Sequence, residues 1–201
     1  EGSGSLAMFD IGSANIDCYI NATGTPSVSG RQTVYLKGTN IATCNIVKGK
    51  VGIAALDGDA ATVATMRIGY VSTQASDADV TIFPGVTLTT LDQGGGTCVQ
   101  RCASTASTCG ANSTLTTDGS GTIATLNVYG TCYANSTGTI TTANVYSGGV
   151  LDLRKIQAAR TITTLNVYPG ATVYGGGWIT LTNKITPQTG GTSSATIYWN
   201  E

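Results

Sequence analysis

One phrase recurs along this chain and limits what it can fold into. It reads TITTLNVYPG from Thr161, TITTANVYSG from Thr139 and TIATLNVYG from Thr122, and looser copies begin at Thr39 and Thr62. Self-similarity at a period of roughly 20 residues is typical of a solenoid, in which each repeat forms one turn and packs on its neighbours. The repeat therefore predicts a stack of similar turns.

Each copy carries three apolar anchors. The last two are two residues apart, the period at which side chains share one face of a strand, whereas the first lies three residues earlier, so the chain turns a corner between them. Gly or Pro-Gly after the last anchor supplies a turn. A half-copy at 80–88 places Val80 and Ile82 as equivalents of Leu165 and Val167. The anchors of the five copies are Ile41/Cys44/Ile46, Val63/Met66/Ile68, Ile123/Leu126/Val128, Ile140/Ala143/Val145 and Ile162/Leu165/Val167.

The composition favours extended chain. There are 35 Thr and 27 Gly among 201 residues, and the stretch at 150–160, VLDLRKIQAAR, is the only short helix candidate. Thr is stiff at Cβ and suits a pleated surface. We predict an all-β chain that forms a parallel β-helix (solenoid), with irregular rungs of about 14–22 residues and capped ends. A β-sandwich or jelly roll is the alternative, because it also gives short strands with frequent turns.

The repeats divide the chain into three parts. We expect an N-terminal lead-in and cap over 1–38, the β-helix over 39–177 with a Cys-rich insert at about 93–121, and C-terminal cap strands over 178–201. Caps cover backbone edges that would otherwise recruit another chain. A net charge of −1 and the lack of a basic patch argue against nucleic acid as a partner. The lack of a run of about 18 apolar residues argues against a membrane-spanning helix.

The cysteines leave two interpretations open. Six are present, so three disulfides are conceivable, but reduced thiols buried in the core fit as well. Disulfides would staple the insert, which has no strong apolar anchor. Cys18 and Cys44 each lie two residues before an Ile, so they are expected one rung apart, either bridged or stacked. The candidates for disulfide bonds are Cys18, Cys44, Cys98, Cys102, Cys109 and Cys132.

Carboxylates are the only candidates for catalysis. Enzymatic cleavage of a sugar chain needs two of them facing one bond, and both Glu residues are terminal. LDGDA and SDADV lie 20 residues apart, which could bring them together on neighbouring rungs. The same cluster could hold calcium, because hard cations prefer oxygen ligands. We favour plain turn residues, and expect no enzyme, no metal and no other cofactor. The four residues are Asp57, Asp59, Asp77 and Asp79.

An aromatic column is the strongest candidate for a binding surface. Tyr129, Tyr146 and Tyr168 each follow the last anchor and should point outward, with Phe83 in the corresponding place. Stacked rungs would make them an external ladder. Exposed aromatic rings suit contacts with proteins or sugars, or they could simply shield the strands. We expect a contact with a subunit or partner.

With the phrases TLNVYPGATV, TITTANVYSGG and TIATLNVYG, the chain resembles β-helical virion proteins of tailed bacteriophages, including tailspike-like, head-fibre and capsid-decoration proteins. The resemblance covers about residues 39–177 and lies in repeat style and composition. It implies a homotrimer of parallel rods on the virion surface, attached to the major capsid protein or other virion proteins. Glycan-cleaving tailspikes carry Asp/Glu pairs in long rungs, and this chain lacks interior Glu, so no catalytic residue carries over.

These observations together predict a non-enzymatic structural protein of a phage virion. A trimeric capsid decoration protein or short head fibre is favoured, because 201 residues leave little room for a long tail-fibre shaft. The alternative is a tailspike-like or tail-fibre-like protein that binds or hydrolyses host glycans. A bacterial surface adhesin or filament subunit is a third class.

Overall fold

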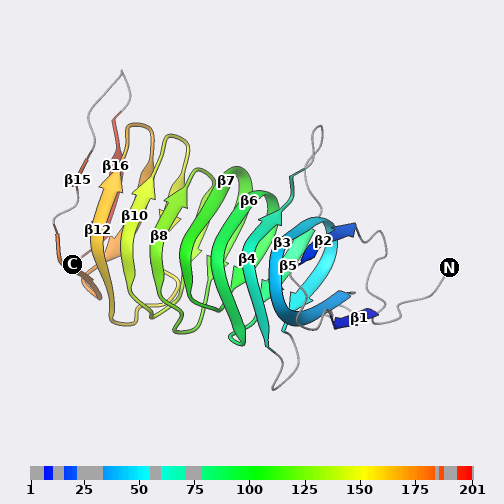
Figure 1. Cartoon of the computed structure of the whole chain (residues 1–201). Helices are drawn as coiled ribbons and strands as arrows, with labels where there is room; N and C mark the ends of the chain where they lie inside the picture. Colours follow the sequence, from blue (N-terminus) through cyan, green and yellow to red (C-terminus); the bar gives the residue numbers. More distant parts are fainter. Residues whose placement is uncertain are drawn as a thin grey trace.

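Parallel strand pairing connects the whole described chain. The computed structural model describes residues 7–10, 16–21, 34–54, 60–70, 78–183, 186–187 and 194–200. Across these residues there is no helix, and the strands form one 16-stranded sheet in which every pairing is parallel. Figure 1 shows an elongated rod with β1–β3 at one end and β12, β15 and β16 at the other. The prediction of an all-β parallel solenoid is confirmed.

Most strands are short, and the long ones (β3, β6 and β7) bend so that their two halves lie on different sides of the rod. Their bounds are β1 Ala7–Asp10, β2 Ile16–Asn21, β3 Val34–Ile53, β4 Ala61–Ile68, β5 Ala78–Ile82, β6 Val86–Gln100, β7 Ser104–Thr117, β8 Ile123–Val128, β9 Thr131–Ala134, β10 Ile140–Val145, β11 Val150–Asp152, β12 Arg160–Val167, β13 Thr172–Gly176, β14 Ile179–Leu181, β15 Thr186–Pro187 and β16 Thr196–Asn200.

Two stacks of strands form the walls of the rod. The first stack runs through the middle of β3, then β4, β6, β7, β8, β10 and β12. The second stack runs through the end of β3, then β5, the ends of β6 and β7, and β9, β11, β13 and β16. The long strands β3, β6 and β7 therefore contribute to both stacks, while later turns use two separate strands.

The predicted anchors form continuous columns in the core. Leu126 is the register partner of Ala143, which in turn pairs with Leu165, and all three are completely buried. The flanking anchors Ile123 and Val128 stack in the same way. Burying apolar area contributes about 25 cal/mol per Å², so each turn gains stability only by covering its neighbour. This dependence explains why the sequence repeats.

The number of residues per turn varies more than predicted, while the anchor residues of neighbouring turns stay paired. Successive partners in the column of the last anchor are separated by 16 to 25 residues, whereas the spacing of the repeats predicts 14 to 22. The differences lie mainly in the connections between strands, because the anchors of paired strands stay aligned despite register shifts between Gly38 and Ile41 and between Gln93 and Gly95. The column contains Ile46, Ile68, Gln93, Cys109, Val128, Val145 and Val167.

The predicted position of the half-copy at 80–88 is wrong. Val80 pairs with Val51 and Cys98, so it belongs to the second stack and is not equivalent to Leu165. Leu88, later in the same half-copy, pairs with Val63 in the first stack. The error arises because a strand, a Pro-Gly turn and a second strand can occur at either corner of a rung, and the sequence pattern is the same in both places.

The Cys-rich segment predicted as an insert is part of the solenoid. Its strands β6 and β7 pair along both stacks. Polar side chains replace the apolar anchors here: Gln100 donates to the Ser104 hydroxyl at 3.0 Å and accepts from the Ser107 hydroxyl at 2.8 Å, and the two serines lie 2.8 Å apart. Buried polar groups are tolerated when they bond to each other. On the turn of β7, Ser104 and Ser107 stand where the next turn has Ile123 and Leu126, so the apolar pattern does not display these anchors.

Residues 150–160 contain no helix, contrary to the candidate in the sequence. Val150, Leu151 and Asp152 form β11, which pairs with β9 and β13. The buried guanidinium of Arg160 then donates to the carbonyls of Leu153 and Ile156. Strand pairing and this side chain use the backbone groups that a helix would need.

The described cysteines of the segment are buried thiols. Cys98, Cys102, Cys109 and Cys132 form no disulfide, so the predicted staple is not seen among them; the core of the two turns holds the segment instead. Cys18 and Cys44 are register partners, as predicted, and the side chain of Cys18 lies outside the described residues. Burial raises the pKa of Cys98 and Cys132 well above the ordinary value and that of Cys102 to about 12.

These thiols predict a loss of stability at alkaline pH. In the unfolded chain they ionise near their ordinary pKa, whereas in the folded chain they stay protonated to a higher pH. The unfolded state therefore releases protons first, and the free energy of unfolding should fall as the pH rises above about 9, by about 1.4 kcal/mol per pH unit for each thiol. Urea denaturation between pH 8 and 11 measures this fall. Cys109→Val, which copies Val128 in the same column, should make the fall shallower; an unchanged slope would contradict the assignment.

Candidate contact surface

The outward face of the first stack carries three columns of identical side chains. The repeated phrase places Thr, Asn and Tyr at every second position, with Thr and Asn on β8, β10 and β12 and Tyr directly after each strand, so all three point away from the core. The register aligns the Thr and Asn columns across the turns, and ring stacking aligns the Tyr column. The columns are Thr125/Thr142/Thr164, Asn127/Asn144/Asn166 and Tyr129/Tyr146/Tyr168.

The three tyrosines form a stacked ladder, which confirms that the column is external. The ring centroids of Tyr129 and Tyr146 are 4.3 Å apart with planes 4° from parallel, and those of Tyr146 and Tyr168 are 4.7 Å apart at 12°. Burial and then the neighbouring Tyr129 raise the pKa of Tyr146. Within this tyrosine ladder the ring faces cover each other, so the ring edges and hydroxyls are what a partner would meet.

An amide ladder beside the rings stiffens the face. Asn144 donates from Nδ2 to Asn127 Oδ1 at 3.0 Å, and Asn166 donates in the same way to Asn144 at 2.9 Å. Each Asn is thereby fixed by the next turn. Side chains held like this have already lost rotamer freedom, so little more entropy is lost when a partner binds.

Phe83 does not belong to the tyrosine ladder, contrary to the prediction. It follows Ile82 at the end of β5, in the second stack, and the guanidinium of Arg101 lies 5.6 Å from its ring centroid. This error follows from the wrong position of the half-copy: because the alignment equates Ile82 with Val167, it also equates Phe83 with Tyr168.

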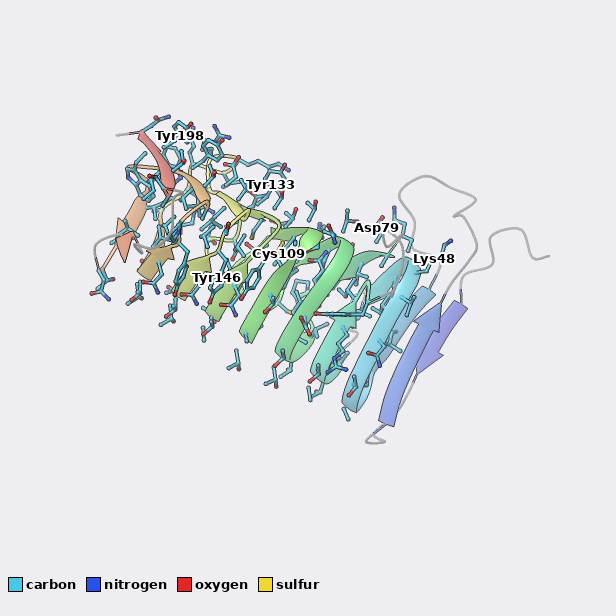
Figure 2. The ribbon with its side chains drawn as sticks, turned by 90° about the horizontal axis from the view of Figure 1, so that it is seen from above. Lys48, Asp79, Cys109, Tyr133, Tyr146 and Tyr198 are labelled. Atoms are coloured by element: carbon cyan, nitrogen blue, oxygen red, sulfur yellow. The ribbon has the colours of Figure 1, made fainter. Side chains whose placement is uncertain are left out.

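A second aromatic surface lies on the second stack, and the search of the sequence for repeats missed it. Tyr133, Asp152, Tyr174 and Tyr198 are successive register partners, and the rings of Tyr174 and Tyr198 stack at 5.0 Å. We call these four residues with Arg154 the mixed ladder. The signal was available: ATVY ends at Tyr174 and ATIY ends at Tyr198. Figure 2 places Tyr146 on one side of the ribbon and Tyr133 and Tyr198 on another.

An arginine takes the place of a ring in the mixed ladder. Asp152 has too short a side chain to stack, and the guanidinium of Arg154 lies 4.0 Å from the Tyr174 ring centroid. Asp152 holds that guanidinium through two bonds, Nε to Oδ1 at 3.0 Å and Nη2 to Oδ2 at 2.7 Å. These hydrogen bonds from Arg154 lower the pKa of Asp152. A planar cation thus continues the stack where a tyrosine is missing.

Of the four candidate carboxylates, Asp79 lies in the part of the chain that the structure describes. Asp79 pairs with Lys50 at 3.5 Å and accepts from the Thr97 hydroxyl at 3.1 Å, both across neighbouring turns. Asp57, Asp59 and Asp77 lie outside the described residues. Among the described residues no three Cys, Asp or Glu side chains are grouped to hold a metal. Asp79 therefore has a structural role as an ion-pair partner.

Comparison with protein-family models, curated proteins and solved structures finds no significant match to this chain. The described residues also contain no helix with the length and apolarity of a membrane span.

Proposed function

We propose that this chain is a non-enzymatic structural protein that binds a protein partner through its tyrosine ladder. The observation that carries the proposal is the stacking of Tyr129, Tyr146 and Tyr168 at 4.3 and 4.7 Å on a wall of paired strands. Tyrosine is enriched at protein interfaces because it combines a large apolar ring with a polar tip. Because the stacked side chains are already ordered, little conformational entropy is lost when they bind a partner.

The ladder geometry supports a protein partner over a glycan. A sugar ring stacks on the face of an aromatic ring, and both faces of Tyr146 are covered by its neighbours. Along the interior of the ladder, hydroxyl groups and ring edges remain, and these suit hydrogen bonds and edge-to-face contacts with side chains and backbone. Hydrolysis of a glycan has no support from Asp79, which is engaged by Lys50 and Thr97.

We place this activity in a phage virion, on the ground of the resemblance in the repeated phrase. The proposed protein is a trimer that decorates the capsid and contacts coat subunits at the virion surface. A protein that binds the assembled shell and not its dissociated subunits stabilises the shell by linkage. The rod suits this role, because its columns give the same contact on several turns. Tail attachment remains an outcome that localisation would show.

The test is to bind a ladder variant to particles stripped of the protein. Tyr146→Ser should weaken binding at least tenfold, because it removes the central ring and leaves its two neighbours unstacked. Its fold should persist, since Tyr146 is outside the core. Co-sedimentation with the particles measures binding, and circular dichroism checks the fold. The matched control is Tyr198→Ser in the mixed ladder, which should bind as the parent does. Equal binding by both variants would contradict the proposal.

A further inference from the structure

The tyrosine ladder ends at a glycine, and this end differs from its interior. Gly110 occupies the position next to Tyr129 on the preceding turn, where Cys109 pairs with Val128. A Cβ at Gly110 would lie 2.4 Å from the carbonyl oxygen of Gln93, so the chain itself cannot place a side chain there. Tyr129 is 40% exposed, while Tyr146 and Tyr168 are half-buried. Among the described residues, Tyr146 is the one ring that stacks on Tyr129, so no ring covers the face of Tyr129 that points toward Gly110.

The next turn beyond Gly110 provides an acid and a ring. Gly94 follows the strand partner of Cys109, and the ring of Tyr70 lies over it, with Cε1 3.0 Å from where a Cβ would be. The hydroxyl of Tyr70 donates to Oδ1 of Asp92. Asp92 points to the same side as Gly94, two residues away. Strands lie about 4.8 Å apart, so Gly110 leaves the space of one planar group between Tyr129 and the turn that carries Asp92.

The chain shows elsewhere what fills such a position. In the mixed ladder, where Asp152 interrupts the rings, the guanidinium of Arg154 stacks on Tyr174 and pairs with the carboxylate. A guanidinium is planar, weakly hydrated and able to bond a carboxylate while it lies on an aromatic face. The end of the tyrosine ladder presents the same two groups, an aromatic ring and a carboxylate. Arg67 is the register partner of Asp92 on the neighbouring turn but forms no ion pair with it, so no guanidinium of the described residues lies between Tyr129 and Asp92 as Arg154 does in the mixed ladder.

We infer that the Gly110 position is a docking site for an arginine side chain of a protein partner. The guanidinium would stack on the free face of Tyr129 and pair with Asp92 through Oδ2, which Tyr70 does not use. A diagonal neighbour on the next strand is about 7–8 Å away, within reach of a long side chain. The inference rests on the proposed function for taking this face as a protein contact, and it names the chemistry of the partner.

The test is an NMR titration of the whole chain with N-acetyl-arginine amide as the probe. The amide signals of Gly94 and Gly110 should shift, and N-acetyl-lysine amide should cause shifts at least threefold smaller, because an ammonium group is not planar. Tyr129→Leu keeps the bulk without the aromatic face and should weaken arginine binding about tenfold; Asp92→Asn should weaken it as well. The matched control is Tyr198→Leu in the mixed ladder, which removes an exposed ring outside the tyrosine ladder and should leave binding unchanged.

Either of two results would overturn the inference: equal shifts with the two probes, or unchanged arginine binding in Tyr129→Leu. The titration needs no particle, so its failure is separate from a failure of the proposed function. If Tyr146→Ser abolished particle binding while the titration showed no arginine preference, the contact face would stand and the arginine site would fall. If the titration succeeded and Tyr146→Ser bound normally, the arginine site would stand without the proposed contact.

Discussion

Replacing Arg160 by Met should lower the free energy of unfolding by about 3–5 kcal/mol. Arg160 is 4% exposed, and its guanidinium has no carboxylate partner among the described residues. The guanidinium instead donates to four carbonyls, those of Ala134, Ser136, Leu153 and Ile156. Met fills a similar volume but leaves these acceptors without their donor, and an unsatisfied buried polar group costs about 1–3 kcal/mol. Urea denaturation monitored by circular dichroism measures the loss.

Two further variants test why Arg160 matters: Arg160→Lys separates its hydrogen bonds from its charge, and Arg154→Met is the control at an exposed arginine. Arg160→Lys keeps the charge but cannot reach four carbonyls with one ammonium group, so it should restore only part of the stability. Arg154→Met removes an exposed guanidinium six residues earlier and should cost a small fraction of the Arg160→Met loss. Similar losses for Arg154→Met and Arg160→Met would show that the buried position has no special role.

Leu126→Ala should destabilise the protein by about 2–5 kcal/mol, the range for removing a buried leucine and leaving a cavity. Its column partner on the next turn is already Ala143, so two small residues would become adjacent and the surroundings could not easily fill the space. Because each turn of a solenoid contacts only its neighbours, we also expect the weakened turn to uncouple its two flanks. Thermal and urea unfolding measure the loss and the sharpness of the transition.

A surface substitution on the neighbouring turn controls for the change in composition. Thr141→Val keeps a β-branched residue at an exposed position of β10 and should alter stability by no more than about 0.5 kcal/mol. A loss in Leu126→Ala no larger than that in Thr141→Val would mean that the column does not form a continuous core.

Local pattern was sufficient for the repeats that keep their apolar anchors. Ile123, Leu126 and Val128 could be assigned to the core because an inward side chain must be apolar unless another buried group bonds to it. The same rule failed at Gln93, Ser104 and Ser107, which are buried but polar. Ser104 and Ser107 bond to each other and to Gln100, which are close in sequence. A search for apolar periodicity passes over such residues, because the sequence does not display which polar side chains turn inward to bond to each other.

Part of the candidate surface could likewise be predicted from the sequence, and part could not. The outward direction of Tyr129, Tyr146 and Tyr168 followed from the strand period, and their stacking followed from the repeat. The mixed ladder did not, because Asp152 breaks the row and Arg154 restores it by folding back over Tyr174. The glycine end of the tyrosine ladder was also invisible, since Tyr70 reaches Gly94 from a different turn.

The sequence by itself determined the class of fold, since a phrase with strand periodicity and a turn can bury its anchors only by stacking on copies of itself. It also determined which side of the strand faces water in the repeats that keep their apolar anchors. Only the tertiary structure decided the register, and with it which turns are neighbours, how Arg160 satisfies distant carbonyls and where the tyrosine ladder ends. The physical reason is that the lengths of the connections between strands vary, while hydrogen bonding between strands aligns the turns regardless of that length.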